Sequence, residues 1–343
     1  MNKTVMSVSS GYQPPYKITP VILSRVSEIN EWIGRHSAVT DALQMPRLRR
    51  ENRIRSIQSS LAIEGNRLNL KQVTAILNGK RVLGLPREIQ EVRNAFTAYE
   101  ALDRLNPFSC RDMLSAHRMM TGGLIDDAGR FRDGGVGVIN GKKVIHMAPP
   151  ACRVPSLVDA LLSWLKTTQE PPLIAGCVFH YEFEFIHPFS DGNGRMGRLW
   201  QTLILARWRP VFSLVPVESI VRDHQSDYYA ALNTCNQSGD ATLFIDFMLT
   251  AILEALSKAS VTEQVTEQVT EQVKRLLVVL KDAAWLTRDA MRALGIHHRP
   301  TFLYSYLKPA LIAGLVEMTQ PDSPRSPSQR YRLTDKGKMM LNG

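Results

Sequence analysis

Cysteine is scarce in this sequence, and long apolar runs are absent from it. The 343 residues include four cysteines, and no two of them have the Cys-x-x-Cys spacing of a zinc or redox motif. The pattern therefore favours reduced, buried thiols over a disulfide framework. No run of about eighteen apolar residues occurs, and residues 1–20 lack the continuous apolar segment of a secretory signal. We therefore expect a cytoplasmic protein without a membrane span.

Hydrophobic residues make up 44% of the chain, which is enough to bury a sizeable core. The length favours two or three domains, and helical periodicity dominates between the loops. The helical stretches that this periodicity predicts are 18–32, 46–57, 70–77, 86–105, 110–120, 154–165, 173–186, 223–233 and 241–256. We divide the chain into an N-terminal helical region (1–105), a central core (106–256) and a final region (257–343).

The most informative segment is His187–Arg198, with the sequence HPFSDGNGRMGR. An apolar run at helical spacing follows it, so a helix should begin near Gly194. A Gly-Asn-Gly turn before a helix exposes backbone N–H groups at the positive end of the helix dipole, which suits an anion. Arg195 and Arg198 lie three residues apart on one helix face and can hold the same polyphosphate.

Two further side chains of this segment suit phosphate chemistry. Asp191 offers hard carboxylate oxygens to a magnesium ion that bridges phosphates. His187 titrates near neutral pH and suits a general base. Together with the anion-binding turn and the two arginines, they indicate a reaction on a nucleotide phosphate. The alternative is an ordinary helix-capping turn with surface arginines.

The segment resembles the signature of the Fic family, H-P-F-x-(D/E)-G-N-G-R-x-x-R. Every fixed position is matched, by His187, Pro188, Phe189, Asp191, Gly192, Asn193, Gly194, Arg195 and Arg198. The resemblance implies a mostly α fold with the Fic helical core and a β-hairpin flap. It also implies transfer of AMP from ATP to a hydroxyl side chain of a protein, with release of pyrophosphate. The related Doc-type phosphotransferases have lysine at the position of Gly194, which favours AMP transfer here.

The resemblance assigns roles to the matched positions. His187 is the implied catalytic base, and Asp191 is the implied Mg²⁺ ligand. A D-Y-Y-x-x-L pattern includes Tyr228 and Tyr229, and we expect Tyr229 to contact the nucleotide base; burial of both as core aromatics is the alternative. The implied ATP-binding residues are Gly192, Asn193, Gly194, Arg195, Met196, Gly197, Arg198 and Tyr229.

A second motif lies far upstream of the first. The segment Ser60–Gly65 fits the family's inhibitory pattern, (S/T)-x-x-x-E-(G/N), through Ser60, Glu64 and Gly65. The carboxylate of Glu64 is expected to pair bidentately with a guanidinium of the site and so withhold that cation from the γ-phosphate. The position of the motif before the core implies an intramolecular, N-terminal inhibitory helix. Taken alone, the motif is a helix end with a glycine cap.

A β-hairpin is predicted between these two motifs. The β-prone runs 136–139 and 142–147 flank Asn140-Gly141, the strongest short hairpin signal, and Gly129–Arg132 precedes them. The family's flap docks the target segment by strand addition at this place. The implied docking residues are Val136, Gly137, Val138 and Ile139. A purely structural hairpin is the alternative.

The final region differs in composition from the rest of the chain. Val-Thr-Glu-Gln repeats three times from Val261, which predicts a connecting helix. Helical stretches at 287–294 and 299–312, followed by strand-like stretches at 315–319 and 331–334, resemble a winged helix. Residues 274–343 have 12 Lys/Arg and 5 Asp/Glu, so this part of the final region carries a net charge of +7, compared with +10 for the whole chain. The basic side chains expected to contact DNA are Arg299, Lys308, Arg325, Arg330 and Arg332. Protein contacts or dimer packing are the alternative.

Two classes of function therefore compete. The first is a Mg²⁺-dependent protein adenylyltransferase that Glu64 restrains, with ATP and a protein bearing a Ser, Thr or Tyr hydroxyl as substrates, the enzyme itself included. The second is a DNA-binding regulator whose core senses nucleotide without transfer, or an enzyme that transfers another phosphate-containing group. The intact His187 and Asp191 favour the first, because sensing needs neither a base nor a metal ligand. A homodimer is common among members of the family that this chain resembles.

Overall fold

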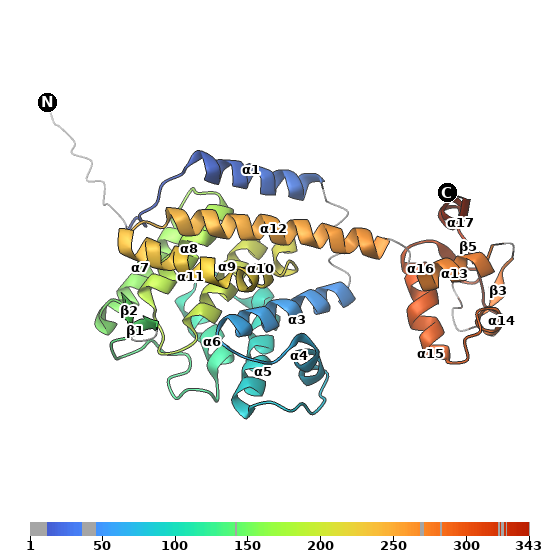
Figure 1. Cartoon of the computed structure of the whole chain (residues 1–343), viewed down its shortest axis with the longest axis horizontal. Helices are drawn as coiled ribbons and strands as arrows, with labels where there is room; N and C mark the ends of the chain where they lie inside the picture. Colours follow the sequence, from blue (N-terminus) through green and yellow to red (C-terminus); the bar gives the residue numbers. More distant parts are fainter. Residues whose placement is uncertain are drawn as a thin grey trace. The chain divides into compact units, whose positions relative to one another are not determined.

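The computed structural model describes residues 12–35, 46–140, 143–267, 271–281, 283–321, 323, 326 and 328–342. The chain divides into two compact units, whose boundary falls between Ser260 and Val261. Helices dominate and strands are few, as Figure 1 shows, so the predicted mostly α fold class is confirmed. The division into three domains at residues 105 and 256 stays a prediction.

The first unit begins with helices that the sequence pattern predicts. They are α1 (Pro20–Arg35), α3 (Pro46–Ile63), α4 (Leu70–Leu77) and α5 (Pro86–Glu100), followed by the 3₁₀ turn η1 (Leu102–Arg104). A capping box between Asn69 and Gln72 starts α4. Two predicted boundaries were wrong. Helix α3 continues six residues beyond Ile57, which places Ser60 in its last turn, and α5 gives way to η1 before Leu105.

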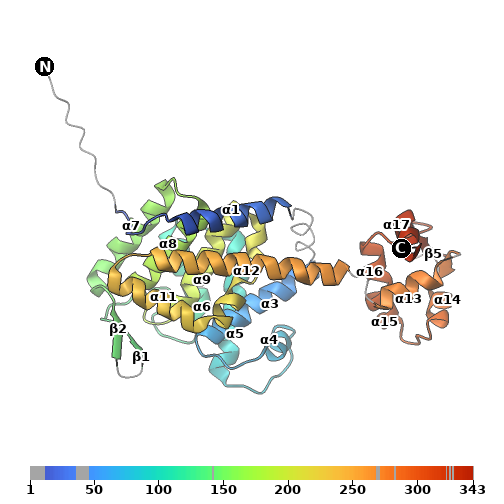
Figure 2. The same cartoon turned by 45° about the horizontal axis from the view of Figure 1, so that its top comes forward.

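The remaining elements of the first unit surround two central helices. They are α6 (Cys110–Thr121), β1 (Gly137–Asn140), β2 (Lys143–Met147), η2 (Ala151–Arg153), α7 (Val154–Thr167), α8 (Pro172–Ile186), α9 (Asn193–Trp208), η3 (Pro210–Ser213), α10 (Val217–Asp223), α11 (Gln225–Ser238) and α12 (Thr242–Glu267). Helix α8 is buried on nearly all sides because most of its residues are apolar. Figures 1 and 2 both show α12 beside α1, across the bundle that contains α8 and α9.

The predicted β-hairpin is present. Strands β1 and β2 pair antiparallel, with Gly137 opposite Met147 and Asn140 opposite Lys143, and the register shifts between Val138 and Ile139. The backbone of the hairpin is continued by a bond from the Ala148 amide to the Val136 carbonyl, 3.2 Å long. The pairing of the two arms therefore extends one residue beyond the strands at the open end of the hairpin.

The second unit has its own apolar core, which includes Leu276, Phe302 and Leu333. Its elements are α13 (Glu271–Val279), β3 (Trp285–Leu286), α14 (Thr287–Ala293), α15 (Arg299–Phe302), the π-turn η4 (Leu303–Leu307), α16 (Lys308–Ile312), β4 (Val316–Met318), β5 (Arg330–Leu333) and α17 (Asp335–Asn342). The strands form an antiparallel sheet in the order β3-β5-β4. The two predicted helices and two predicted strands are present, whereas β3 was too short to predict. The winged-helix assignment stays a prediction.

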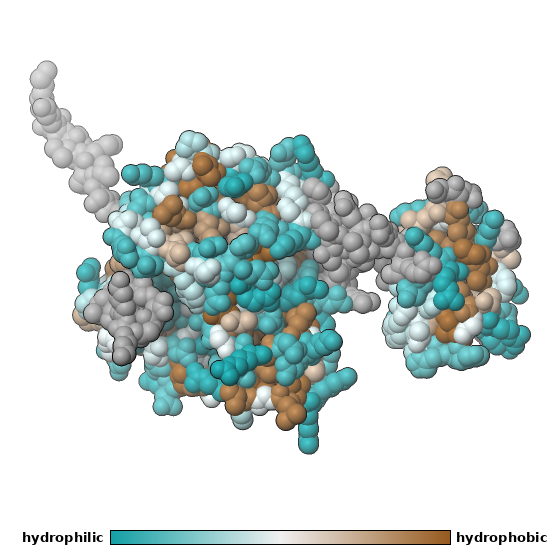
Figure 3. Space-filling model, viewed as in Figure 1, coloured by the Kyte–Doolittle hydropathy of each residue, from teal (hydrophilic) through white to brown (hydrophobic). Residues whose placement is uncertain are grey.

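The visible face of the first unit in Figure 3 is largely hydrophilic, with separate apolar patches. Among the described residues, no helix combines the length and the apolar character needed to span a bilayer. The four cysteines are free thiols, and Cys177 and Cys235 are buried. The expected burial holds for these two thiols, but it was wrong for Cys152, which is exposed, and Cys110 is only partly buried.

Candidate active site

The loop between α8 and α9 starts with a strained residue. His187 ends α8 in the left-handed conformation, with φ 49° and ψ 61°, and it is the only non-glycine residue with positive φ in the described part of the chain. A β-carbon makes this conformation costly, by roughly 1–2 kcal/mol. Pro188 prevents the helix from continuing. The predicted base is therefore held on a turn that leaves the helix, and surrounding contacts must hold that turn.

Arg132 supplies several of those contacts. Its guanidinium donates to the carbonyl of His187 from Nε at 2.7 Å, and to the carbonyls of Pro149 and Gly134 at 2.6 and 2.8 Å. Its backbone N–H donates to the carbonyl of Pro188 at 3.0 Å. Burial lowers the pKa of Arg132, whose exposure is only 4%. Because Gly134 precedes β1 and Pro149 follows β2, Arg132 joins the turn that carries His187 to the base of the hairpin.

His117, on α6, holds the other side of the loop. Its ring stacks on Phe189, with centroids 3.6 Å apart and an interplanar angle of 4°. The amide of Gly129 donates to Nδ1 at 2.9 Å, so Nε2 carries the proton and donates to the carbonyl of Asp191 at 3.0 Å. Burial lowers the pKa of His117, which keeps the ring neutral. Sequence reasoning missed this role of His117, because a single histidine in an amphipathic helix belongs to no motif.

The N-terminus of α9 is built from glycine and one asparagine. Gly192 is the N-cap with φ 87°, and no side chain caps the helix. The Asn193 side chain instead closes the loop: it accepts from the Phe189 amide at 2.9 Å and donates to the Phe189 carbonyl at 2.8 Å. The first backbone N–H groups of α9 are therefore not used by a capping side chain. The glycine turn and the helix start lie where the sequence predicted them, and the binding of an anion by these N–H groups stays a prediction.

Two predicted ATP-binding residues face the protein interior. Met196 is fully buried in the apolar core. A β-carbon at Gly197 would lie 2.8 Å from Cδ2 of His180 and 2.9 Å from Oε1 of Glu184, so glycine is needed for the close approach of α8 and α9. The structure thus shows a packing role for these two positions, and their role in ATP binding stays a prediction.

The carboxylate of Asp191 contacts two guanidiniums. Its Oδ1 accepts from Nη2 of Arg195, and its Oδ2 accepts from Nη2 of Arg87, both at 2.9 Å. The Arg195 side chain is 4% exposed, whereas those of Asp191 and Arg87 are 38% and 58% exposed. Arg87 belongs to the first turn of α5, and the sequence did not indicate it.

The Asp191 carboxylate could bind a magnesium ion if Arg87 or Arg195 released the carboxylate oxygen that it contacts. No group of three or more His, Cys, Asp or Glu side chains suited to a metal occurs in the described residues. Magnesium commonly binds through one or two carboxylates and completes its shell with substrate phosphates and water. Asp191 beside the N-terminus of α9 supplies the single carboxylate that such a site requires.

The inhibitory motif lies against the second arginine of the signature. Oε1 of Glu64 accepts from Nη2 of Arg198 at 2.7 Å, and Ser60 accepts from Nε through Oγ at 3.1 Å and from Nη2 through its carbonyl at 3.0 Å. The expected bidentate pairing was therefore wrong: one oxygen of Glu64 contacts Arg198, because Ser60 occupies the Nε edge. Burial is the largest single influence on the pKa of Arg198 and lowers it, but the charges of Glu64, Tyr228 and Glu184 and the hydrogen bond from Glu64 together outweigh burial and raise that pKa.

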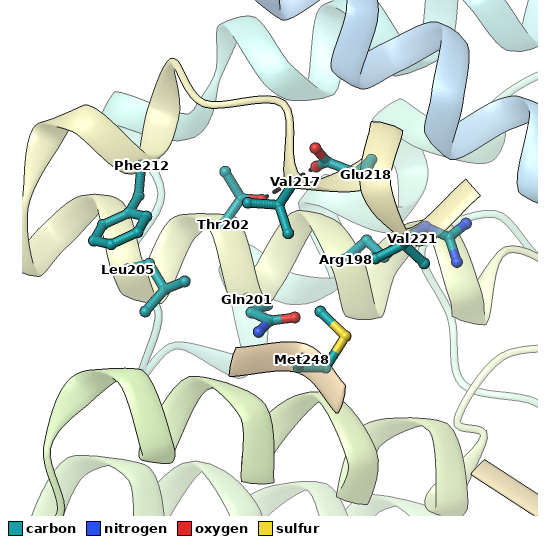
Figure 4. A pocket seen from close by; sticks show the side chains of 9 residues that line it. All are labelled: Arg198, Gln201, Thr202, Leu205, Phe212, Val217, Glu218, Val221 and Met248. Carbon is teal, nitrogen blue, oxygen red and sulfur yellow. Dashed lines mark hydrogen bonds between the residues drawn. The ribbon is translucent and has the colours of Figure 1, made fainter. Parts of the chain in front are cut away.

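Gly65 and Gly194 make this contact possible. Gly65 has φ 89° and ends the turn that follows α3. A β-carbon at Gly194 would collide with Oε1 of Glu64 and would lie 3.1 Å from Nη1 of Arg198. Glu64 therefore occupies the space directly beside the N-terminal backbone of α9. Figure 4 shows Arg198 at the end of a small cavity along α9, with Glu218 of α10 opposite.

The two tyrosines of the D-Y-Y-x-x-L pattern have different environments. Tyr228 is 1% exposed and its hydroxyl lies 3.2 Å from Nε2 of His180, so it is a core aromatic. Tyr229 is 45% exposed, and its hydroxyl donates to the carbonyl of Ile63 at 3.3 Å. The choice of Tyr229 as the residue that contacts the base stays a prediction.

Two protein families and a solved structure match this chain. Residues 107–205 match the Fic/DOC family, and residues 271–334 match the C-terminal domain described as "Filamentation induced by cAMP protein Fic-like". A crystal structure of a Fic family protein from Desulfovibrio desulfuricans G20 is 56% identical. That match covers 95% of this chain and 99% of that chain, with a TM-score of 0.73. The helical core and the loop after α8 are those of a Fic protein. The chain belongs to the Fic family.

More distant relatives have names that state an activity. The protein adenylyltransferase Fic of Aedes aegypti is 29% identical over 225 residues, which is 62% of this chain and 43% of that protein. The protein adenylyltransferase fic-1 of Caenorhabditis elegans is 32% identical over 217 residues, which is 59% of this chain and 40% of that protein. This chain thus spans less than half the length of the curated relatives that it matches.

Proposed function

We propose that the protein is an adenylyltransferase that moves AMP from ATP to a hydroxyl side chain of a protein and is restrained by Glu64. One observation carries the proposal. Nε and Nη1 of Arg195 and Nη1 of Arg198 are buried without a hydrogen-bond partner in the described part of the chain. Unpaired buried donors are costly, by about 1–3 kcal/mol or more for charged groups. A polyphosphate at the N-terminus of α9 would supply the missing acceptors.

The proposed reaction is an in-line displacement at the α-phosphorus. The target hydroxyl oxygen forms a bond to this phosphorus while the bond to the bridging oxygen of the β-phosphate breaks, and the electron pair leaves with pyrophosphate. His187 accepts the hydroxyl proton. Magnesium bound at Asp191 would neutralise charge on the leaving pyrophosphate. Arg195 and Arg198 orient the phosphates, and the β1–β2 hairpin is proposed to position the target segment next to His187.

The nucleotide base is proposed to lie against α11. Tyr229 is on the exposed face of this helix, and Asn236 lies seven residues later, which is the same face after two turns. Oδ1 of Asn236 is buried without a partner among the described residues. An adenine amino group is a donor that would satisfy this acceptor. Sequence reasoning missed Asn236, because a single asparagine in a helix gives no signal.

Glu64 restrains the reaction by competition. Its carboxylate and the γ-phosphate both require the guanidinium of Arg198, and that guanidinium is 3% exposed and held by Ser60 as well. With Arg198 occupied, ATP would bind through its base and α-phosphate in a pose unsuited to attack. Removal of the Glu64 carboxylate is therefore expected to realign the triphosphate.

Labelled ATP tests the proposal. The protein and its Glu64→Gly variant are incubated with magnesium and with ATP labelled at the α- or the γ-phosphate, and label on protein is measured. AMP transfer predicts label from α-ATP alone. Label from γ-ATP alone would mean phosphoryl transfer. ATP binding without either label, in both proteins, would favour the nucleotide-sensing alternative.

A second function is proposed for the C-terminal unit, namely contact with duplex DNA. The exposed side chains of the segment 299–308 include Arg299, Thr301, Tyr304, Ser305 and Lys308, and none is acidic. Lys308 lies 4.5 Å from the ring centroid of Tyr304. Arg332, in contrast, pairs with Glu317 at 2.6 Å, and Arg325 lies outside the described residues. Arg299 and Lys308 are therefore better candidates for phosphate contacts than Arg332.

The full chain is titrated with duplex DNA at two ionic strengths to test this. Binding through phosphates should weaken steeply as salt rises, and replacing both Arg299 and Lys308 by alanine should reduce the salt dependence by about two phosphate contacts. Absence of binding at low salt would favour protein contacts instead.

A cytoplasmic location, where ATP is available and thiols stay reduced, and self-association as a homodimer are also proposals.

A further inference from the structure

The end of the inhibitory helix is fixed by side chains outside both motifs. The last carbonyls of an α-helix lack partners within the helix. At the end of α3, the amides of Glu64 and Asn66 both bond the carbonyl of Leu61, at 3.1 Å. The carbonyl of Ile63 instead accepts from Nε2 of Gln225 at 2.8 Å and from the hydroxyl of Tyr229 at 3.3 Å. Both donors belong to the first two turns of α11.

A second set of contacts joins α3 to α10 one and two turns earlier. Ser56 donates to Oε2 of Glu218 at 2.8 Å, and Glu218 is only 3% exposed. Arg222 donates from Nη1 to Oε1 of Gln58 at 2.8 Å and to Oγ of Ser59 at 3.1 Å. Figure 4 shows Glu218 near Thr202 of α9, with which it is also hydrogen-bonded. These contacts hold the body of α3, whereas Gln225 holds its last turn.

We infer that Gln225 is a positioning residue for the inhibitory contact: it fixes the carbonyl of Ile63 and thereby sets the place from which Glu64 reaches Arg198. The inference rests on the proposed function and goes beyond the Glu64–Arg198 contact. Gln225 contacts the peptide unit that joins Ile63 to Glu64, so its bond directly constrains the backbone of the inhibitory residue.

The exposure of Glu64 explains why its backbone must be held. Its side chain is 37% exposed, and one of its oxygens makes the contact with Arg198. Arg198 is buried and fixed, whereas water can also reach the Glu64 carboxylate, so the carboxylate stays on Arg198 only if its backbone is held nearby. Occupancy of this contact therefore depends on how well the turn after α3 is ordered. The Gln225 bond is short and links this turn to a helix of the core.

The same bond connects inhibition with nucleotide binding. Tyr229, the second donor to Ile63, is the residue proposed to contact the base. A nucleotide that engages the Tyr229 hydroxyl leaves Gln225 as the remaining donor to Ile63. Ordering of the turn and binding of the nucleotide are then coupled, and the coupling acts equally in both directions.

The experiment compares Gln225→Met, which keeps the size of the side chain and removes the donor, with Gln237→Met as the matched control. Gln237 lies on the same helix, is exposed and donates to Asn233 of that helix. Loss of one hydrogen bond changes an equilibrium constant, here that between the inhibited and the released turn, by about three- to tenfold. We expect Gln225→Met to raise transfer from α-labelled ATP onto the protein by this factor, and Gln237→Met to leave it unchanged. In the Glu64→Gly background, Gln225→Met should have no further effect.

Amide hydrogen exchange provides a readout that does not depend on transfer. The amides of Glu64, Gly65 and Asn66, which bond carbonyls of Leu61 and Ala62, should exchange faster in Gln225→Met while the melting temperature stays that of Gln237→Met. Unchanged exchange at these amides would overturn the inference, as would equal activation by Gln225→Met with and without Glu64. If no variant transfers label from α-ATP, the proposed function fails, and the exchange result still decides the role of Gln225.

Discussion

Oε1 of Glu64 lies 2.7 Å from Nη2 of Arg198, although 134 residues separate the two in the sequence. One partner ends a helix of the N-terminal region, and the other belongs to the first turns of α9, inside the family signature. The contact therefore joins two sequence motifs into one site.

Removal of the Glu64 carboxylate should raise AMP transfer. In Glu64→Gly, Arg198 loses its anionic partner and becomes available to the γ-phosphate. The measurement is incorporation of α-label at saturating ATP and magnesium. The double variant Glu64→Gly, His187→Ala serves as the control, and it should fall about 10²–10⁴-fold below Glu64→Gly because general-base assistance is lost. Equal activity of Glu64→Gly and the parent protein would refute the inhibitory role.

Arg87 should compete with magnesium for Asp191. Magnesium requires a bare carboxylate oxygen, and Arg87 is the more exposed of the two arginines on that carboxylate. An exposed pair is worth about 0.2–1 kcal/mol, so Arg87→Ala should lower the magnesium concentration for half-maximal transfer by less than about fivefold. Arg81→Ala, which removes an exposed arginine from the preceding loop, is the control.

Asp191→Ala provides the limiting case for that prediction. It should abolish the dependence of transfer on magnesium concentration, both as a single change and in combination with Arg87→Ala. The same magnesium midpoint in Arg87→Ala and the parent protein would show that Arg87 does not occupy the metal site.

Glu184 should make the protein less stable at alkaline pH. Burial, with a smaller contribution from Glu64, raises the pKa of Glu184 from 4.5 to about 8, against the opposing charge of Arg198. The folded protein thus keeps a proton that the unfolded chain loses, and the free energy of unfolding falls as pH rises from about 4.5 to 8. The limiting slope is about 1.4 kcal/mol per pH unit.

His180 has the opposite effect at lower pH. Burial lowers the pKa of His180 from 6.5 to about 3, so the free energy of unfolding rises with pH over that window. The two effects oppose each other between pH 4.5 and 6.5 and leave Glu184 alone above 6.5. Urea unfolding at pH 6.5 and 8 should show a loss in the parent protein that Glu184→Gln lacks. A loss of equal size in both proteins would contradict this assignment.

Two buried glycines should respond differently to alanine. A β-carbon at Gly197 would lie under 3.0 Å from His180 and Glu184, whereas one at Gly176 would meet Leu205 and Gln201 at ordinary distances of 3.5–3.7 Å. Overpacking typically costs about 1–3 kcal/mol, so Gly197→Ala should lower the free energy of unfolding by that amount. Gly176→Ala should be neutral or stabilising by up to about 1 kcal/mol, because alanine favours a helix. Equal urea midpoints for the two variants would contradict the packing argument.

The sequence predicted the helices and the hairpin because their signals are local. Periodicity, prolines and the Asn-Gly turn are properties of neighbouring residues, and they located α4, α9 and β1–β2 well. The signature likewise located His187, Asp191 and the arginines, since these are adjacent in the chain. Helix ends were less certain: α3 continues past Ile57 to Ile63, where Gly65 with φ 89° provides a local glycine cap that the predicted range 46–57 did not use.

The side chains that sequence reasoning missed are those that act through tertiary contacts. Arg87, His117, Arg132 and Gln225 come from four different segments, and each contacts a loop or helix end that another segment provides. No spacing in the sequence reports such contacts. The same reason explains the error about Glu64, because only the fold shows that Ser60 occupies the Nε edge of Arg198.

The placement of Glu64 and Arg198 in one chain has a consequence for how inhibition responds to protein concentration. An intramolecular ligand has an effective concentration that the fold sets, and dilution does not change it. The proposed inhibition should therefore be the same in a cell that contains few copies of the protein and in one that contains many. Abundance alone cannot switch such an enzyme on. If Glu64 inhibits as proposed, activation would require a change of conformation at the end of α3, brought about by a partner, a modification or the nucleotide itself.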